Sequence, residues 1–107
     1  MTSEGPALIW CPFPSRDAAA RVAGTLLDER LIACANVLPG MLSLYEWKGE
    51  RGGDEEAGAL FKTDAALLDR AIARISALHP YEQPTIIGWR CEAASPQTAQ
   101  WLGALLD

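Results

Sequence analysis

The sequence predicts an α+β fold of the ferredoxin-like class, in which one antiparallel sheet carries two helices on one face. Three observations predict it. Apolar segments of strand length alternate with segments of helical periodicity in the order β-α-β-β-α-β. A polar, Gly-rich segment separates the two middle strands, and a Ser-Pro pair near the end begins a further, C-terminal helix. At 107 residues the chain is expected to form a single domain, residues 1–107.

The first half of the chain holds one helix between two expected strands. Residues 7–13 (ALIWCPF) form an apolar run closed by proline, which indicates a buried strand. Ser15 can cap the helix that follows, because its hydroxyl oxygen can accept from a free backbone N–H of the first turn. Apolar residues then recur at helical spacing, at Ala19, Val22, Ala23, Leu26 and Leu27. Residues 33–47 predict a long second strand with a bulge or bend at Pro39-Gly40.

The second half repeats the pattern. Residues 48–56 (KGERGGDEE) are expected to be a polar hairpin connection, and residues 57–63 the third strand. Thr63 or Asp64 caps a second helix that should end at His79, since proline pushes its predecessor out of the helical region. Residues 84–92 predict the fourth strand, and Ser95-Pro96 begins a final helix that reaches residue 106.

The second strand is too long for its neighbours. An extended chain over residues 33–47 would span roughly 50 Å at ~3.3 Å per residue, far beyond what the short neighbouring strands can pair with. Its distal half would leave apolar side chains uncovered, at Met41, Leu42, Leu44, Tyr45 and Trp47. Because uncovered strand edges and apolar patches favour association, we expect the sheet to continue into another subunit.

Composition excludes several classes of partner. The formal net charge is -5 and the basic residues are scattered, so we expect neither nucleic acid nor a membrane surface as a partner. The N-terminal residues lack the basic flank and apolar core of a signal peptide, and no apolar run is long enough to cross a bilayer. Three cysteines without a C-x-x-C pair are typical of reduced thiols, which predicts a cytoplasmic protein.

Several short motifs together resemble the CutA family, which is named for tolerance to divalent cations. They are Ala33-Cys34-Ala35-Asn36, Pro39-Gly40, Tyr45-x-Trp47-x-Gly49, Lys62-Thr63 and His79-Pro80-Tyr81, and the similarity runs from the first strand to the terminal helix. The resemblance implies a ferredoxin-like subunit in a tight trimer, with hairpins pairing between neighbours and clefts at the subunit boundaries. It also implies a link to copper and other divalent ions, and no established enzymatic activity.

The motifs of the resemblance place Tyr45, Trp47, Lys62, His79 and Tyr81 in such a cleft. We add Glu56 and Glu82, because the residues of this set lie at strand ends and in the His-Pro loop, where a trimer could bring them together. On this hypothesis Lys62 supplies a positive charge for a small anionic ligand, and the aromatic rings form a stacking wall. Each residue also has a purely structural interpretation. The aromatic side chains can pack the trimer interface, and the long Lys62 side chain can extend to solvent.

The metal-binding hypothesis concerns Cys11 and His79. Cys11 ends the first strand just before a Pro-Phe-Pro segment, where we expect its thiol to be more exposed than that of Cys34. The position of Cys11 matches the cysteine implicated in copper binding in the family, and copper favours imidazole and, when reduced, thiolate ligands. Some members have a second histidine where this chain has Leu78, so Glu82, water or a neighbouring subunit would have to complete the site. Binding should weaken in acid as the imidazole protonates. Alternatively, His79 merely ends a helix, and Cys34 is expected to be an inert core thiol.

Three classes of function follow. The leading one is a non-enzymatic trimer involved in divalent-cation tolerance, and the second is a sensor with a small-molecule ligand in the cleft. An enzyme with a Cys-His pair ranks last, because nothing places either Cys11 or Cys34 beside a base. No dinucleotide, P-loop, zinc-protease or serine-hydrolase motif is present, so we expect no catalytic residues and no organic cofactor.

Overall fold

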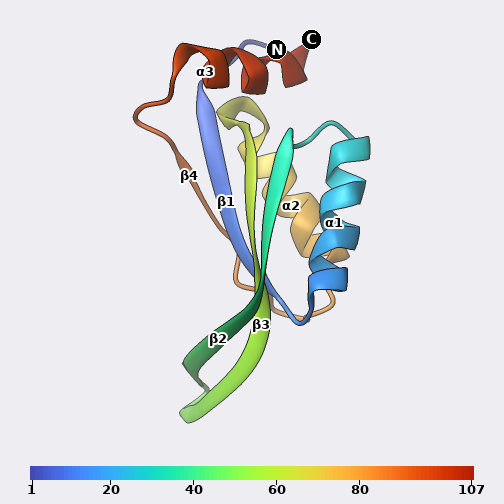
Figure 1. Ribbon diagram of the computed structural model, residues 1–107, viewed down its shortest axis with the longest axis vertical. Coiled ribbons are helices and arrows are strands. Elements are labelled where there is room, and N and C mark those ends of the chain that lie inside the picture. The colour runs from blue at the N-terminus through green and yellow to red at the C-terminus, as the bar shows by residue number, and fades with distance from the viewer.

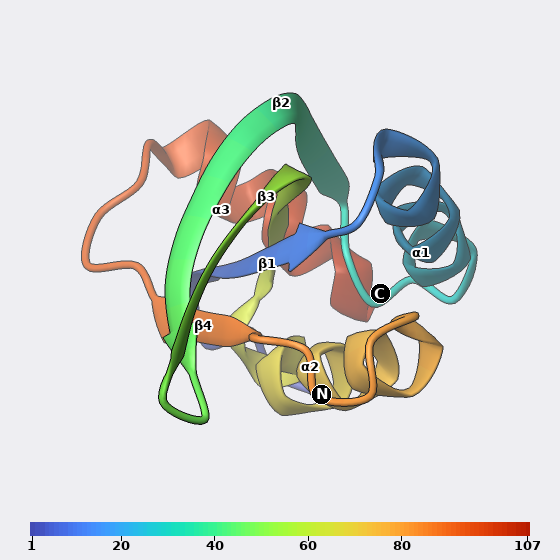
Figure 2. The same cartoon turned by 90° about the horizontal axis from the view of Figure 1, so that it is seen from below.

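A computed structural model describes all residues from Met1 to Asp107 and confirms the ferredoxin-like class. The elements are β1 (Pro6–Phe13), α1 (Arg16–Asp28), β2 (Cys34–Trp47), β3 (Glu50–Asp64), η1 (Ala65–Leu67), α2 (Leu68–Leu78), β4 (Ile87–Arg90), α3 (Pro96–Gly103) and η2 (Ala104–Leu106). The four strands form one antiparallel sheet in the order β2-β3-β1-β4. Helices α1 and α2 lie on one face, and α3 crosses the end of the sheet near both termini (Figures 1 and 2).

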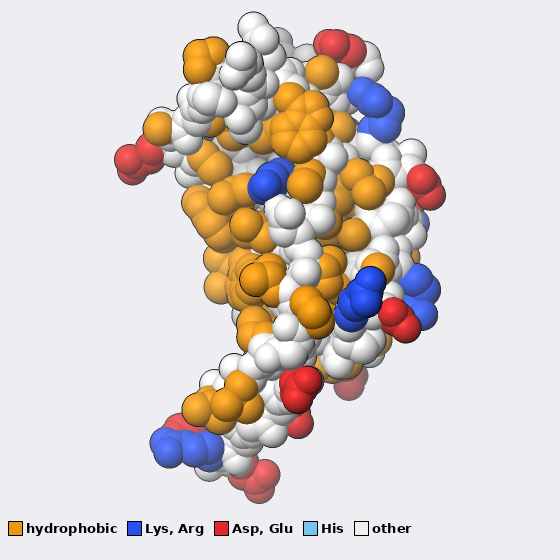
Figure 3. Space-filling view, viewed as in Figure 1, with side chains coloured by type: hydrophobic (Ala, Val, Ile, Leu, Met, Phe, Trp, Pro, Cys, Tyr) orange, Lys and Arg blue, Asp and Glu red, His pale blue; other side chains and the backbone are white.

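The core lies between the sheet and these two helices. Strand β1 alternates strictly, with every second side chain fully buried from Ala7 to Phe13. Strand β3 adds Ala59 and Phe61, while α1 and α2 contribute Leu26 and Ile75, all of them fully buried. The other face of the sheet carries no helix. It leaves Leu38, Ile87 and Trp89 exposed, and Figure 3 shows hydrophobic side chains gathered over the strands.

The helix boundaries follow the predicted caps. The hydroxyl oxygen of Ser15 accepts from the backbone N–H of Ala18 at 3.1 Å, and that of Ser95 accepts from Thr98 at 3.2 Å. Of the two candidates for the second helical segment, Asp64 is the cap, since its carboxylate accepts from the N–H of Ala66 at 2.9 Å. His79 has extended dihedrals (φ -67, ψ 138) and ends α2, as the proline after it predicts.

Two predicted boundaries were wrong. Residues 50–56 are not a connection but the first part of β3, and the turn consists of Lys48 and Gly49 alone. Both have positive φ, 52° and 80°, which is typical of the tight type I′ hairpin that joins twisted strands. The fourth strand covers only residues 87–90 of the expected 84–92. It pairs with Ala7 to Trp10 of β1, and Pro84 has no N–H for a ladder.

Residues 41–56 form a two-stranded ribbon, here called the hairpin extension, that projects from the body of the molecule (Figure 1). Strand β1 pairs with β3 only from Ala57 to Asp64, so β3 beyond that point has β2 as its only neighbour. The register shifts between Leu38 and Met41, which confirms the bulge predicted at Pro39-Gly40. The radius of gyration, 14.4 Å, exceeds the ~13 Å of a compact chain of this length.

The hairpin extension exposes apolar side chains as the sequence predicts. Leu42 is 70% exposed and Leu44 is 75% exposed, on the opposite face of β2 from Tyr45 and Trp47. None of the helices is long and apolar enough to cross a membrane.

Candidate functional site

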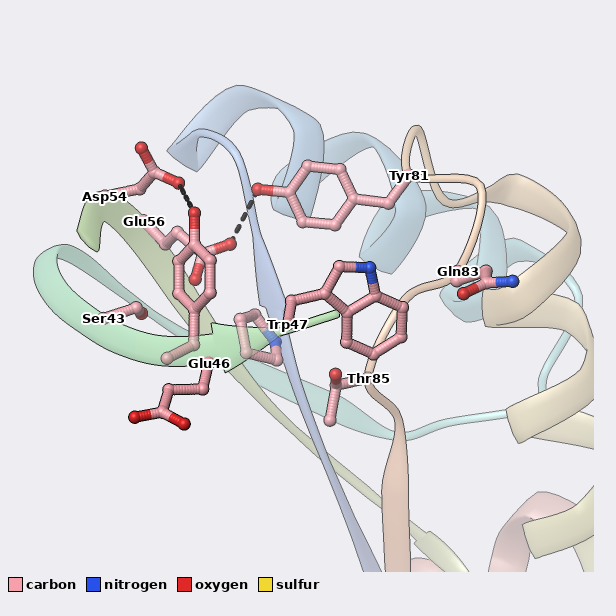
Figure 4. Close-up of a pocket in the computed structure, with 10 residues that line it drawn as sticks. Ser43, Glu46, Trp47, Asp54, Glu56, Tyr81, Gln83 and Thr85 are labelled. Atoms are coloured by element: carbon pink, nitrogen blue, oxygen red, sulfur yellow. Dashed lines mark hydrogen bonds between the residues drawn. The ribbon is translucent and has the colours of Figure 1, made fainter. Parts of the chain in front are cut away.

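A cavity of about 460 Å³ lies between the hairpin extension and the loop that follows α2 (Figure 4). We call it the hairpin cleft. A single chain supplies all ten of its lining residues: Pro12, Ser43, Tyr45, Glu46, Trp47, Asp54, Glu56, Tyr81, Gln83 and Thr85.

The hairpin wall of the cleft depends on strand alternation and one glycine. Asp54 and Glu56 are two residues apart on β3 and so lie on the same face, where Tyr45 faces Gly52 across the ladder. The Tyr45 ring lies over Gly52, and a Cβ at that position would come within 2.7 Å of the ring atoms. Only glycine allows this placement, in which the Tyr45 hydroxyl donates to the Asp54 carboxylate at 2.6 Å.

The loop wall is anchored by His79, which is only 7% exposed. Its Nδ1 accepts from the backbone N–H of Tyr81 at 3.0 Å, so its Nε2 carries the hydrogen and donates to the carbonyl of Pro12 at 2.8 Å. The ring also stacks on Phe13 with centroids 4.4 Å apart. Both nitrogens are therefore engaged, and the imidazole holds the start of the loop against the end of β1.

Tyr81 connects the two walls. Its ring lies 4.9 Å from the His79 ring, and its hydroxyl donates to the Glu56 carboxylate at 2.7 Å. Burial first, and then the hydrogen bond to Glu56, raise the pKa of Tyr81. The hydrogen bond to Asp54 is the main cause that raises the pKa of Tyr45. Both phenols therefore remain protonated donors, each bound to one carboxylate.

The charge of the cleft is negative. Glu46, Asp54 and Glu56 line it, and no lysine or arginine does. Glu46 pairs with Arg51 at 2.7 Å and points away from the other two carboxylates (Figure 4). Asp54 and Glu56 have no cationic partner, so the cleft attracts cations and repels anions.

The structure brings together only part of the residue set predicted for the cleft. Tyr45, Trp47, Glu56 and Tyr81 line it, whereas Glu82 does not and His79 supports the loop from behind. Lys62 lies six positions beyond Glu56 along β3, roughly 20 Å away at ~3.3 Å per residue. Within one subunit it lies beside Leu8 and Cys34 and supplies no charge to the cleft, so an anionic ligand bound by Lys62 stays a prediction for a cleft shared between subunits.

Asp54 is absent from the predicted set because residues 48–56 were expected to be a polar hairpin connection. The polar side chains of Ser43, Gln83 and Thr85 also line the cleft and were not predicted. The two-residue spacing of Asp54 and Glu56 could have indicated that both acids share one face, but only if residues 50–56 are known to form a strand. Nothing in the sequence marks Ser43, Gln83 or Thr85.

The two residues predicted to bind copper are not arranged as ligands in this conformation. Cys11 was expected to be the more accessible thiol, yet it faces the helices and is fully buried. Burial first, and then the charge of Glu56, raise the pKa of Cys11 to about 12, so it carries no thiolate. Cys34, expected in the core, is half-buried at the start of an edge strand.

His79 likewise offers no free ring nitrogen, since each one makes a hydrogen bond within the chain. No group of three or more His, Cys, Asp or Glu side chains is placed to hold a metal ion within the subunit. Copper binding by Cys11 and His79 would therefore require both side chains to rearrange.

Comparison with known proteins identifies a match over almost the whole chain. Residues 7–104 match the family model described as CutA1 divalent ion tolerance protein. The chain is 39% identical over 95 residues to the divalent-cation tolerance protein CutA of Pyrococcus horikoshii, covering 89% of this chain and 92% of that one. For the Thermus thermophilus protein of the same name the identity is 37% over 89 residues, with 83% and 86% covered.

The chloroplastic CutA of Arabidopsis thaliana is 32% identical, and the chain spans only 52% of its length. Solved structures agree in fold. CutA1 from Ehrlichia chaffeensis superposes with a TM-score of 0.91 at 31% identity, covering 100% of this chain and 98% of that one. CutA from Xylella fastidiosa gives the same TM-score at 34% identity, with 97% and 100% covered.

Proposed function

Because the chain belongs to the CutA1 divalent ion tolerance protein family, we propose that it is a non-enzymatic homotrimer that binds divalent cations in the hairpin cleft. The observation that carries the proposal is the charge of this cleft, where Asp54 and Glu56 face a cavity with no basic residue in its walls. The family is named for ion tolerance rather than for a reaction. The protonated, buried Cys11 thiol is also a poor nucleophile.

The oxygen atoms of the cleft suit a hard divalent ion. Each carboxylate accepts one hydrogen bond from a tyrosine and keeps further lone pairs for an ion. Two carboxylates are too few for a closed site, so water or a residue from a neighbouring subunit has to complete it. Copper at Cys11 and His79 is the alternative metal proposal. It requires the thiol to lose its proton and His79 to release Pro12 or Tyr81.

The proposed trimer is supported by the unpaired edges and uncovered faces of the subunit. Strands β2 and β4 lie at opposite edges of the sheet, so that β2 of one copy can pair with β4 of the next and close a ring. Exposed apolar residues lie on the hairpin extension, at Leu42 and Leu44, and on the open sheet face, at Ile87 and Trp89. A two-stranded hairpin is marginally stable alone in water, so a neighbouring subunit would stabilise it.

The size of the cleft favours a second candidate function, that of a small-molecule sensor. A volume of about 460 Å³ lies within the range of small-molecule sites, roughly 300–1,000 Å³, and exceeds what a single ion requires.

For the cellular location of the protein we propose the cytoplasm. The three free cysteines, none of them in a disulfide, support a reducing compartment.

Calorimetric titration of the metal-free protein with Mn²⁺ and with Cu²⁺ tests the cation proposal. We expect binding that is lost in the double variant Asp54→Asn with Glu56→Gln and retained in Cys11→Ser. Loss in Cys11→Ser with retention in the carboxylate variant would move the site to the thiol. If neither Mn²⁺ nor Cu²⁺ binds, the cation proposal is overturned.

A further inference from the structure

We propose that the hairpin cleft binds an aliphatic diammonium ion, held between the Asp54 and Glu56 carboxylates and the rings of Tyr45, Trp47 and Tyr81. The inference deepens the proposed function because it concerns the same cleft, but it requires neither the trimer nor a metal site. All the residues that it uses belong to one chain.

The acids and tyrosines of the cleft present hydrogen-bond acceptors to it, while Ser43, Gln83 and Thr85 can donate or accept. Both tyrosine hydroxyls have already donated their hydrogens to the carboxylates. A carboxylate has about four lone-pair sites, so Asp54 and Glu56 each retain unused acceptors, and the phenolic oxygens add more. A ligand that satisfies these acceptors carries hydrogen-bond donors, and the two unpaired negative charges favour a cation. Together they favour a primary ammonium group over a quaternary one and disfavour anions.

The apolar wall suits the methylene chain of such a ligand. Tyr45, Trp47 and Tyr81 present rings to the cavity, and Pro12 adds an aliphatic surface. Figure 4 shows the Trp47 and Tyr81 rings on neighbouring sides of the space that the carboxylates border. Aromatic faces attract cations through the ring quadrupole, and they pack against the methylene groups of an alkylamine. A bare metal ion would use none of this surface.

The spacing of the two acids indicates two positive charges on the ligand. Asp54 and Glu56 are two residues apart on an extended strand, which separates their backbones by roughly 7 Å at ~3.3 Å per residue. A diamine with a short methylene chain spans such a distance when extended. Since Arg51 already pairs with Glu46, two negative charges remain, and a diammonium ion would neutralise both.

Calorimetric titration of the full chain with 1,4-diaminobutane tests this proposal. The comparison ligands are n-butylamine, tetramethylammonium and succinate. We expect the diamine to bind at least tenfold more tightly than the monoamine, and we expect no measurable binding of tetramethylammonium or succinate. Equal affinity for the diamine and tetramethylammonium, or binding of succinate, would overturn the proposal.

Variants locate the ligand. Glu56→Gln should weaken diamine binding at least tenfold, whereas Glu55→Gln removes the same charge from the opposite face of β3 and should leave the affinity unchanged. Tyr81→Leu should weaken it several-fold, and Tyr81→Phe should restore it because the ring is retained. Equal losses in Glu55→Gln and Glu56→Gln would mean binding by net charge alone and would contradict the site.

Titrations of the parent protein separate this inference from the proposed function. A hard ion uses the oxygen ligands of the cleft and not its rings, so Mn²⁺ and the diamine are tested in separate titrations of the same protein. If Mn²⁺ binds and the diamine does not, the diammonium inference is wrong and the cation proposal stands. If the diamine binds and no divalent ion does, the diammonium inference stands and the cation proposal is wrong.

Discussion

Strands β2 and β3 run through two regions with opposite properties. In the body, β3 has neighbours on both edges and helices over one face, so Ala57, Ala59 and Phe61 are completely buried. In the hairpin extension the same strands pair only with each other, and Leu44 and Trp47 remain 75% and 55% exposed. The body buries its apolar side chains within one chain, whereas those of the extension stay exposed. In the proposed trimer, a neighbouring subunit would cover them.

The largest predicted effect belongs to the body. Phe61→Ala should lower the free energy of unfolding by about 3–5 kcal/mol, because it leaves a cavity under α1 and α2 beside Phe13. Urea unfolding at fixed protein concentration measures this. Phe61→Leu is the control, since it retains most of the volume and should cost far less. A loss below about 1 kcal/mol for the alanine variant would mean that the two regions do not differ in packing as described.

The next effect concerns assembly by the extension. The double variant Leu42→Ser with Leu44→Ser should weaken subunit association at least tenfold, because these side chains are exposed in the single chain and are expected to be covered in the trimer. Light scattering over a dilution series measures the mass. Leu27→Ser is the matched control, since Leu27 is a 44% exposed leucine on α1 and should not affect assembly. If both variants associate equally well, the apolar side chains of the extension have no special role in assembly.

A smaller effect distinguishes a carboxylate in the body from one in the extension. Burial alone would raise the pKa of Asp64, but hydrogen bonds from Glu4, Ser3 and Ala66 lower it below its ordinary value. Asp64 thus stabilises the fold above its unfolded pKa of about 3.9, and this contribution is lost as the pH falls through the lower, folded pKa.

Asp64→Asn should therefore cost about 1–2 kcal/mol at pH 7, and the deficit should shrink as the pH falls below about 4. Denaturation curves from pH 7 to 2.5 measure it, with Asp54→Asn as the exposed control that should change stability little. A deficit that stays constant across this range would contradict the assignment.

The smallest expected effect is at the tip of the extension. Arg51 and Glu46 form an ion pair at 2.7 Å, but their side chains are 80% and 65% exposed. Solvent and salt screen such pairs, so Arg51→Gln should leave the unfolding curve and the oligomeric mass unchanged. A clear decrease in stability or in oligomeric mass would show that a partner subunit buries this ion pair.

The body was predictable from the sequence and the extension only partly so. Apolar spacing and the caps at Ser15 and Ser95 locate the helices, because both signals are local. The polar residues 50–56 give no strand signal, since their pairing depends on the two-residue turn at Lys48-Gly49 and on backbone hydrogen bonds to β2.

The site was harder to predict because it depends on which face each side chain occupies. The register shift between Leu38 and Met41 changes the face of every later residue of β2, so alternation alone would misplace Tyr45 and Trp47, and only the family resemblance assigned them to a cleft. Alternation also places Cys11 in the core, although the prolines around it suggested exposure.

The mass of the parent protein in dilute solution tests the central claim most directly, namely that the hairpin extension is completed by neighbouring subunits. Sedimentation equilibrium at micromolar concentration should give three times the chain mass of 11.5 kDa, with no smaller species. A stable monomer or dimer at that concentration would contradict the account.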